Sequence, residues 1–307
     1  MFRTDKIAIL MATYNGEKYI EEQLDSILKQ SNQNWVLYIH DDGSSDQTPQ
    51  IILEYQNKYP DKICLLEGEK TGGAKNNFLY LTSQVEAPYY MYADQDDVWK
   101  PSKIELTIDV MKEEEKENPI LVFSELEVVD ENLNVIAEKM SAYQGLDCTK
   151  ISINRALIQN VVTGCTMMMN RLLRDEMLKG LSQSESILMH DWWAYLIAAR
   201  FGKVCFIEKS TIYYRQHSDN GVGARNANAL RYKIGRMFSG KEIRKSLINT
   251  RNQAKLFAKL YEVDDESLVR KYAELGTKNK IERIRFYFKN DVKKSTSSKN
   301  LGLIMWG

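Results

Sequence analysis

Residues 89–101 of the chain read YYMYADQDDVWKP, and this stretch decides the fold. An apolar and aromatic run leads directly into three carboxylates, Asp94, Asp96 and Asp97, and Pro101 follows shortly afterwards. An apolar run before a polar turn and a proline-started helix predicts a buried strand whose carboxyl end is exposed. In an open α/β sheet, ligands bind at that end of the strands.

Three carboxylates at the end of one strand repel one another unless a cation lies between them. Hard divalent cations such as Mg²⁺ and Mn²⁺ prefer oxygen ligands of this kind. The alternative is an acidic surface turn without a ligand, and the motif alone does not separate the two interpretations. The rest of the chain has to decide whether residues 94–97 belong to a site.

Apolar runs and helical patterns alternate through the first hundred residues. We expect strands at residues 6–12, 35–40, 63–66 and 89–93, and helices after residues 15, 47 and 73, the first with Asn15 as its N-cap. This alternation predicts βαβ units and a parallel, doubly wound sheet. We therefore predict an α/β fold, with a mostly parallel central sheet flanked by helices.

Right-handed crossovers bring the carboxyl ends of these strands to one edge of the sheet. The polar segments expected to meet there are residues 13–14, 41–42, 72–77 and 94–97. The chain has neither the GxGxxG fingerprint of dinucleotide sites nor the GxxxxGK[ST] pattern of a P-loop. Carboxylates with a metal ion are therefore expected to do what a glycine-rich loop does elsewhere.

The second half of the chain predicts further strands and one more polar cluster. Strands are expected at residues 120–123, 126–129, 160–170, 204–207 and 211–214, with residues 137–155 as a loop over the site. The sequence MHDWW at 189–193 begins a helix, and RQHSDNGVG at 215–223 is a polar loop. Gly164 lies inside a strand pattern, which often marks either a bulge or close approach of a ligand. The methionines at 167–169 are expected to be core residues.

Composition sets limits on the class of protein. The 307 residues carry 42 basic and 42 acidic side chains, and 43% of them are hydrophobic, so a substantial core is expected and no nucleic-acid partner is predicted. The four cysteines form no C-x-x-C pair and are expected to be free thiols in a reducing cytoplasm. The start of the chain reads as a strand and not as a signal peptide. There is no apolar run of 18 residues.

The chain becomes basic after residue 224. Residues 225–251 hold eight Lys or Arg and one acid, and residues 271–299 hold nine against three, with apolar residues at helical spacing. We predict a domain at 1–224 and a helical region at 225–307. This region is either a basic amphipathic surface that contacts the inner face of a membrane or a solvated appendage of the first domain.

Five motifs now line up in the order of a known family. They are ATYNGEKYIEEQLDSILKQ, IHDDGSSDQT, YADQDDVWKP, MHDWW and YRQHSDNGVG. Over residues 6–223 the chain resembles the inverting glycosyltransferases of family 2, which have the GT-A fold. The form of the third, fourth and fifth motifs resembles the rhamnosyltransferase branch. That branch builds bacterial cell-surface polysaccharides from dTDP-L-rhamnose.

The resemblance implies roles for individual residues. Those implied to bind the nucleotide-diphospho-sugar donor are Ala12, Thr13, Tyr14, Asp42, Lys75, Asp94 and Arg215. Asp42 would accept a hydrogen bond from the pyrimidine N3–H, Asp94 would lie near the ribose or the sugar, and Arg215 would neutralise the diphosphate. Asp96 and His217 would hold a divalent cation, Mg²⁺ or Mn²⁺. The job of Asp97 is left unassigned.

On the acceptor side, Asp191 matches the position of the family's catalytic base. The usual pair there is Glu-Asp and here it is His-Asp, so the role of His190 is left open. The residues expected to line the acceptor pocket are Trp99, Gly164, His190 and Trp192. Taken singly, Asp191 would be a helix N-cap, His217 a loop hydrogen-bonding group and each tryptophan a core residue. The functional interpretation rests on the motifs together.

The implied function is transfer of a sugar, L-rhamnose as the first choice, to a glycan or an undecaprenyl-linked acceptor. One alternative is a UDP-hexose transferase of the same fold, and another is a catalytically silent scaffold of a polysaccharide assembly complex. A nucleotidyltransferase would need a glycine-rich basic loop after the first strand, where this chain has only Gly16 and Lys18. The resemblance leaves the oligomeric state open.

Overall fold

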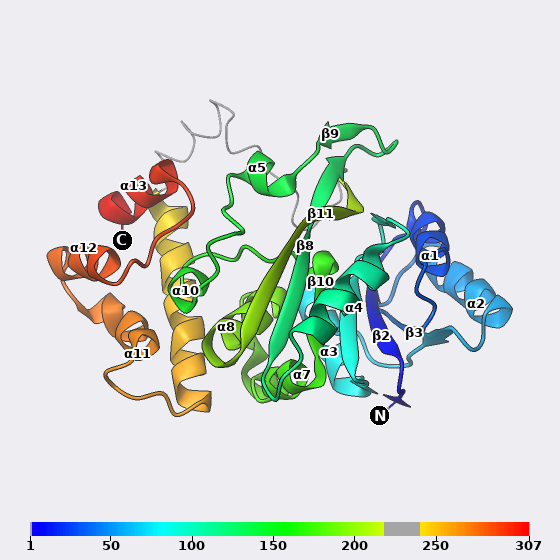
Figure 1. The fold of residues 1–307 in the computed structure, drawn as a ribbon, viewed down its shortest axis with the longest axis horizontal. Coiled ribbons are helices and arrows are strands. Elements are labelled where there is room, and N and C mark those ends of the chain that lie inside the picture. The colour runs from blue at the N-terminus through cyan, green and yellow to red at the C-terminus, as the bar shows by residue number, and fades with distance from the viewer. Residues whose placement is uncertain (1, 218–239, 307) are drawn as a thin grey trace.

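The computed structural model describes residues 2–217 and 240–306. A twisted sheet forms the middle of the molecule, helices cover both of its faces, and the last helices gather at one side (Figure 1). The strands are β1 (Phe2–Arg3), β2 (Ile7–Thr13), β3 (Trp35–Asp41), β4 (Ile63–Leu65), β5 (Val85–Glu86), β6 (Tyr89–Ala93), β7 (Val98–Trp99), β8 (Ile120–Val129), β9 (Val135–Ala137), β10 (Met167–Asn170) and β11 (Lys203–Arg215). The helices of the sheet region are α1 (Ile20–Leu28), α2 (Thr48–Lys58), α3 (Ala74–Gln84), α4 (Lys103–Glu113), α5 (Met140–Gln144), α6 (Ile153–Ala156), α7 (Arg171–Leu178) and α8 (His190–Phe201). The later helices are α10 (Gly240–Leu260), α11 (Leu268–Ala273), α12 (Lys280–Lys289) and α13 (Ser297–Trp306), and the short 3₁₀ turns are η1 (Gly164–Thr166), η2 (Leu181–Ser186) and η3 (Glu274–Thr277).

The first half of the sheet has the predicted parallel arrangement. The order of the main sheet is β4-β3-β2-β6-β10-β8-β11-β7, and the pairs β4–β3, β3–β2 and β2–β6 are all parallel. The β2 strand is buried almost throughout, because helices cover both faces of a parallel sheet. The carboxyl ends of β2, β3 and β6 therefore lie at one edge, as the alternation of strands and helices predicted.

The second half of the sheet is mixed. Strand β10 runs antiparallel to both β6 and β8, whereas β11 runs parallel to β8. The sequence predicted two strands in each of the regions 120–129 and 204–214, and each is one long strand with irregular register in β11. The polar residues of β8 do not interrupt it, because Ser124 Oγ pairs with Thr211 Oγ1 of β11 at 2.6 Å and Glu125 accepts hydrogen bonds from Ser141.

Two local predictions are wrong. Helix α1 begins at Ile20 and not at residue 16, and Asn15 is not its cap. Asn15 has a φ of 48°, and its side-chain oxygen accepts a hydrogen bond from Ser45 N at 2.8 Å, which ties the loops after β2 and β3 together. The predicted strand at 160–170 is reduced to β10, because the chain at 160–166 curves along a cavity and forms a 3₁₀ turn at Gly164–Thr166.

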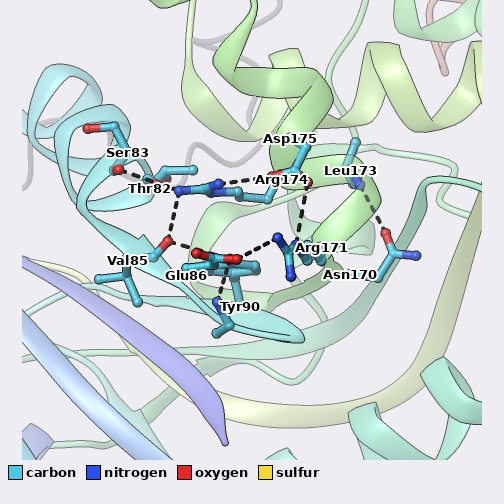
Figure 2. A network of polar contacts seen from close by, with 11 residues as sticks. Thr82, Ser83, Val85, Glu86, Tyr90, Asn170, Arg171, Leu173, Arg174 and Asp175 are labelled. Carbon is cyan, nitrogen blue, oxygen red and sulfur yellow. Dashed lines mark hydrogen bonds and ion pairs between the residues drawn. The ribbon is translucent and has the colours of Figure 1, made fainter. Parts of the chain in front are cut away.

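Arginines fix the far edge of the sheet, opposite the acidic cluster. Arg174 is buried and donates to the carbonyls of Thr82 and Val85 at 3.0 and 2.9 Å, and Arg171 pairs with Glu86 at 2.5 Å (Figure 2). Asn170 caps α7 by accepting from Leu173 N at 3.1 Å. These contacts hold α7 against the end of α3 and the segment that leads into β6.

The core lies on both faces of the sheet. One apolar cluster joins α3, α7, α8 and the C-terminal helices, and the other joins α1, α2 and α4. The three methionines at 167–169 are fully buried, which confirms that they are core residues. The four cysteines are free, as predicted, with Cys148 and Cys165 buried and the other two partly exposed.

The C-terminal region is helical where the structure describes it. Helix α10 packs on α8, with Phe257 stacked on Phe201 at 5.7 Å between ring centroids and edge-on to Trp193 at 5.8 Å. The predicted boundary at 224/225 and the basic stretch up to residue 239 lie outside the described residues. Among the helices that are described, none is both long and apolar enough to cross a bilayer.

Candidate active site

The predicted strand ends meet at a cavity of about 830 Å³. It is formed by the loops after β2, β3 and β6, the start of α3, the segment from α5 to η1 and the start of α8. The predicted site residues that line it are Ala12, Thr13, Tyr14, Asp42, Asp94, Asp96, Gly164, His190, Asp191 and Trp192. A single cavity therefore brings together residues of all five motifs, which the sequence keeps far apart, and the turn before α3.

At one end of the cavity, Asp42 organises a glycine turn. Its carboxylate accepts hydrogen bonds from Thr71 N at 2.5 Å, Thr71 Oγ1 at 2.9 Å and Gly73 N at 2.7 Å. Burial tends to raise the pKa of Asp42, but the hydrogen bonds from residues 71–73 outweigh it and hold the pKa below its usual value. Gly72 and Gly73 have φ of 82° and 108°, a region that favours glycine.

A glutamine joins the loop after β2 to the acidic loop after β6. Gln95 Oε1 accepts from Tyr14 N at 2.8 Å, and Gln95 Nε2 donates to Tyr14 O at 2.9 Å. The Tyr14 ring itself is exposed at the cavity. This fixes the backbone around Tyr14 while leaving an aromatic face open, which suits stacking on a flat ring.

The three acids of the opening stretch have different surroundings. Asp94 and Asp96 line the cavity, and the Asp96 carboxylate lies 2.8 Å from His217 Nε2. Burial, together with the charges of Asp96 and Asp191, raises the pKa of Asp94 to about 7. Asp97 has no exposed surface and points away from the cavity lining, with Oδ1 accepting from Arg215 N at 3.2 Å.

Asp97 belongs to a buried group beneath the cavity. Its neighbours there are Cys165 and the fully buried Lys103, whose ammonium lies 4.6 Å from the centre of the Trp99 ring. Burial raises the pKa of Asp97 and lowers that of Lys103 to about 8. The sequence left the role of Asp97 unassigned. Its contacts in the structure are all with buried residues beneath the cavity, so its role is structural.

Two groups of residues in the described part of the chain have donor atoms close enough for a metal ion. Ligand atoms of Asp94, Asp97 and Cys165 lie within 4.8 Å of one another, but burial raises the pKa of the Cys165 thiol, which disfavours the thiolate that binds metals. Asp96 and His217 offer a carboxylate oxygen and an imidazole nitrogen beside the cavity. That pair fits Mn²⁺ or Mg²⁺ better, since it presents a hard anionic oxygen next to the space for a ligand.

At the other end of the cavity, Asp191 lies in the first turn of α8. The N-cap of this helix is Met189, so the interpretation of Asp191 as the cap is wrong. Burial raises the pKa of Asp191 to about 6, although hydrogen bonds from Trp192 N, the Asn160 side chain and Gly164 N oppose the shift. A carboxylate with this pKa is mostly ionised at neutral pH and is a stronger base than an exposed aspartate.

His190 is packed as a neutral aromatic residue. Its ring lies between Phe78 at 4.4 Å and Tyr92 at 4.7 Å, measured between centroids, and burial lowers its pKa to about 3. Neither ring nitrogen has a hydrogen-bond partner in the structure. A Cβ added at Gly164 would lie 2.7 Å from His190 Nε2, so only glycine fits beside this ring.

Four residues expected at the site lie outside the cavity lining. His217 lies beside it, against Asp96, and for the other three, Lys75, Trp99 and Arg215, we correct the predicted roles. The Lys75 ammonium donates to the carbonyls of Ser184 and Ile187 at 2.8 and 3.0 Å, which fixes the turn before α8. Trp99 is buried in the core beside α4. The Lys75 ammonium and the Trp99 ring were expected at the site, but hydrogen bonds hold the first and core packing holds the second away from the cavity.

Arg215 is the third of these residues. Its guanidinium lies over the Tyr19 ring, pairs with Glu22 and donates to the carbonyl of Glu131 and, at 2.9 Å, to that of Asp96. It is buried, and its contacts support the acidic loop from behind. Arg215 therefore positions Asp96 and does not face the cavity.

Several cavity residues were missed by the sequence analysis. They include Lys70, Asn160, the apolar pair Val161 and Val162, and Tyr214, together with Asn77 and Gln95, which lie in segments expected at the site but were given no role. Gln95 and Lys70 lie within or beside motifs that were recognised, so their position was a usable signal. Asn160 carried no such signal, because only the curve of the chain before η1 turns it toward Asp191.

Comparison with known proteins shows the family. The family model for glycosyl transferase family 2 matches residues 8–176. The dTDP-rhamnosyl transferase RfbG of Shigella flexneri is 34% identical over 253 residues, covering 79% of this chain and 83% of RfbG. The glucosyltransferase WfgD of Escherichia coli, which acts on α-D-GlcNAc-diphosphoundecaprenol, is 32% identical over 168 residues, or 54% of this chain and 61% of WfgD.

Solved structures agree on the fold. Residues 1–349 of TarS from S. aureus, in complex with UDP-GlcNAc, match with a TM-score of 0.53 at 16% identity, covering 94% of this chain and 88% of that one. The likeness confirms the GT-A architecture that the motifs implied. With the family model matching more than half of the chain and RfbG similar over about four fifths of it, this protein belongs to glycosyltransferase family 2.

Proposed function

We propose that the protein transfers a sugar, with inversion, from a nucleotide-diphospho-sugar to a hydroxyl group of a polysaccharide or lipid-linked acceptor. The observation that carries this proposal is the cavity that contains Asp42, Asp96 and Asp191 on different walls. It has a glycine turn and the start of a helix at the Asp42 end and a buried base, Asp191, at the other. TarS, which has this fold, has been solved with UDP and with UDP-GlcNAc.

The proposed step needs one proton acceptor and one stabilised leaving group. The acceptor oxygen bonds to the anomeric carbon, the bond from that carbon to the diphosphate breaks, and the nucleoside diphosphate leaves with the electron pair. Asp191 takes the proton of the attacking hydroxyl, and its raised pKa suits it to this role at neutral pH. General base assistance of this kind is worth about 10²–10⁴ in rate.

Asp96 and His217 are the residues that would hold a divalent cation. When bound, such a cation supplies positive charge that stabilises a departing diphosphate. The residues of the chain itself contribute the rest: Asp42 shapes the glycine turn at its end of the cavity, and Gln95 fixes Tyr14 for stacking. Arg215 donates a hydrogen bond to the backbone carbonyl of Asp96 and so fixes the loop that carries it.

The donor that we propose is dTDP-L-rhamnose. The cavity lining includes Phe78, Val161, Val162, Met189 and Trp192, and these apolar side chains suit the methyl group of a 6-deoxy sugar. The similarity to the dTDP-rhamnosyl transferase RfbG supports the same sugar. The similarity to the UDP-glucose enzyme WfgD supports the alternative, a UDP-hexose transferase.

A donor screen tests both proposals. Purified protein is incubated with dTDP-L-rhamnose, UDP-glucose, UDP-galactose and UDP-GlcNAc, with Mn²⁺ or with EDTA, and release of the nucleoside diphosphate is measured. We expect the fastest release from dTDP-L-rhamnose and loss of it in EDTA. Faster release from a UDP-hexose would favour the alternative donor, release that is unchanged by EDTA would refute the metal site, and no release from any donor would favour a silent scaffold.

The place of action follows from the acceptor. If the acceptor is linked to undecaprenyl diphosphate, as it is for WfgD, the enzyme must reach the surface of a bilayer. We propose that it works there as a peripheral protein. The basic C-terminal helices are the part of the chain that would make this contact.

A further inference from the structure

The helix pair α12–α13 carries apolar side chains on its outer surface as well as on its inner one. On α12, Tyr287 faces the core, whereas Ile281 and Phe288 are 72% and 55% exposed. The exposed pair is seven residues apart, which places both side chains on one face of the helix. A helix with apolar residues on both sides has a face that lacks a partner.

Helix α13 repeats this pattern beside α12. Leu303 and Gly302 are buried, while Leu301, Ile304 and Met305 are exposed at helical spacing. Both helices belong to the group at the C-terminal end of the molecule (Figure 1), and Lys280 Nζ at the start of α12 donates to Met305 O at the end of α13 at 3.2 Å. We define the face formed by Ile281, Phe288, Leu301, Ile304 and Met305 as the outer face.

The segment that carries the outer face is also rich in basic residues. Residues 278–306 contain eight Lys or Arg and two acids. Lys278, Lys280, Arg285 and Lys289 are all exposed, and Arg285 lies on α12 between the two exposed apolar residues. Apolar side chains set among flexible cations match the boundary between the headgroups and acyl chains of an anionic bilayer.

The same helices are tied to the acceptor end of the cavity. Lys299 Nζ of α13 donates to the carbonyls of Gln144 and Gly145 at 2.8 and 3.0 Å, and Gln144 lines the cavity. Nearby, Ser295 N donates to Gln159 Oε1 at 2.7 Å, one residue before Asn160, which contacts Asp191. A surface held by α13 therefore lies close to the wall where an acceptor enters.

From this arrangement we infer that the outer face of α12–α13 binds the surface of an anionic lipid bilayer and holds the acceptor end of the cavity against it. The inference deepens the proposed function, since it names the surface through which a lipid-linked acceptor would be reached. It does not depend on which sugar is transferred. The occupant is a membrane and not a second copy of the chain, because the cations around the face would repel those of a copy docked on the same face.

Vesicle sedimentation tests the inference. The full chain is mixed with vesicles of phosphatidylglycerol and phosphatidylcholine, or of phosphatidylcholine alone, and the bound fraction is measured. We expect the parent protein to bind to the anionic vesicles only. In Ile281→Ser/Phe288→Ser this binding should be weaker by about tenfold or more. The matched control is Val135→Ser/Ile136→Ser, which removes two exposed apolar residues from β9 and should bind like the parent protein.

Three results would overturn the inference. They are no binding of the parent protein to anionic vesicles, equal binding to neutral ones, and full binding by Ile281→Ser/Phe288→Ser. The outer face would instead be assigned to a second copy of the chain by a different result. In that case the parent protein is a dimer by light scattering and does not bind vesicles, and Ile281→Ser/Phe288→Ser is a monomer whereas the control variant stays a dimer. Circular dichroism checks that both variants fold, and nucleotide release with a water-soluble acceptor should stay unchanged in both, which separates loss of the membrane contact from loss of transfer.

Discussion

Asp42 and Asp191 are the same side chain at two ends of one cavity, and their surroundings shift their pKa values in opposite directions. Around Asp42, backbone N–H groups of residues 71–73 outweigh burial and stabilise the carboxylate. Around Asp191, burial outweighs the hydrogen bonds and raises the pKa to about 6. The donor end is thus built as a permanent anion that shapes a turn, whereas the acceptor end holds a group that can take up a proton.

Replacing the acceptor-end aspartate should have the largest effect. In Asp191→Asn we expect transfer to fall by about 10²–10⁴, because the amide cannot accept the proton of the attacking hydroxyl. Nucleotide binding, measured by calorimetry, should be retained. Asp109→Asn, at an exposed position of α4, is the matched control and should leave transfer unchanged.

The pH dependence of transfer gives a second test of Asp191 as the base. Since the base must be ionised and its pKa is about 6, the transfer rate of the parent protein should rise with pH and level off above about pH 6. Below that value it should fall about tenfold per unit. A residual rate in Asp191→Asn with the same pH limb would show that another group is the base.

Replacing the donor-end aspartate should act on binding more than on the chemical step. Asp42→Asn places an amide against the N–H groups of Thr71 and Gly73, which costs about 1–3 kcal/mol. We expect the KM for the donor to rise by roughly tenfold or more with a smaller change in kcat. Steady-state kinetics would measure both, with Asp5→Asn as an exposed control; a fall confined to kcat would contradict a purely structural role for this carboxylate.

The smallest effect is expected at Gly164, which packs against His190 of α8. In Gly164→Ala the new Cβ would lie 2.7 Å from His190 Nε2, so the ring or the turn must shift, at a cost of about 1–3 kcal/mol in stability. Thermal unfolding measures this cost. Gly276→Ala is the matched control, since its nearest neighbour would be at an ordinary 3.7 Å, and equal unfolding temperatures for the two variants would mean that the packing at His190 tolerates a methyl group.

The two ends also differ in how far the sequence could predict them. The donor end is made from short segments that directly follow strands β2, β3 and β6, so the pattern of apolar runs placed Thr13, Asp42 and Asp94 correctly. The acceptor end uses residues 140–164, whose pattern was weak and which form short helices and a curved segment in place of the expected loop and strand. Their shape is set by contacts with α8 and α13 and not by local periodicity.

Charged and aromatic residues in motifs were the hardest to place. The motif put Lys75, Arg215 and Trp99 at the site, but a long or large side chain can turn toward any partner that satisfies it. Lys75 reaches two backbone carbonyls, Arg215 reaches Tyr19 and Glu22, and Trp99 packs beside Lys103. Such choices depend on neighbours that are distant in sequence.

By itself the sequence determined the family, the parallel half of the sheet and the edge at which its acids gather, because these follow from apolar periodicity and from the ends of strands. Only the tertiary structure decided what each acid does there. It separates Asp96 at the cavity from Asp97 beneath it, and it gives Asp42 and Asp191 opposite pKa shifts. The physical reason is that burial and hydrogen-bond partners come from residues far apart in the chain, and these set the free energy of a charge.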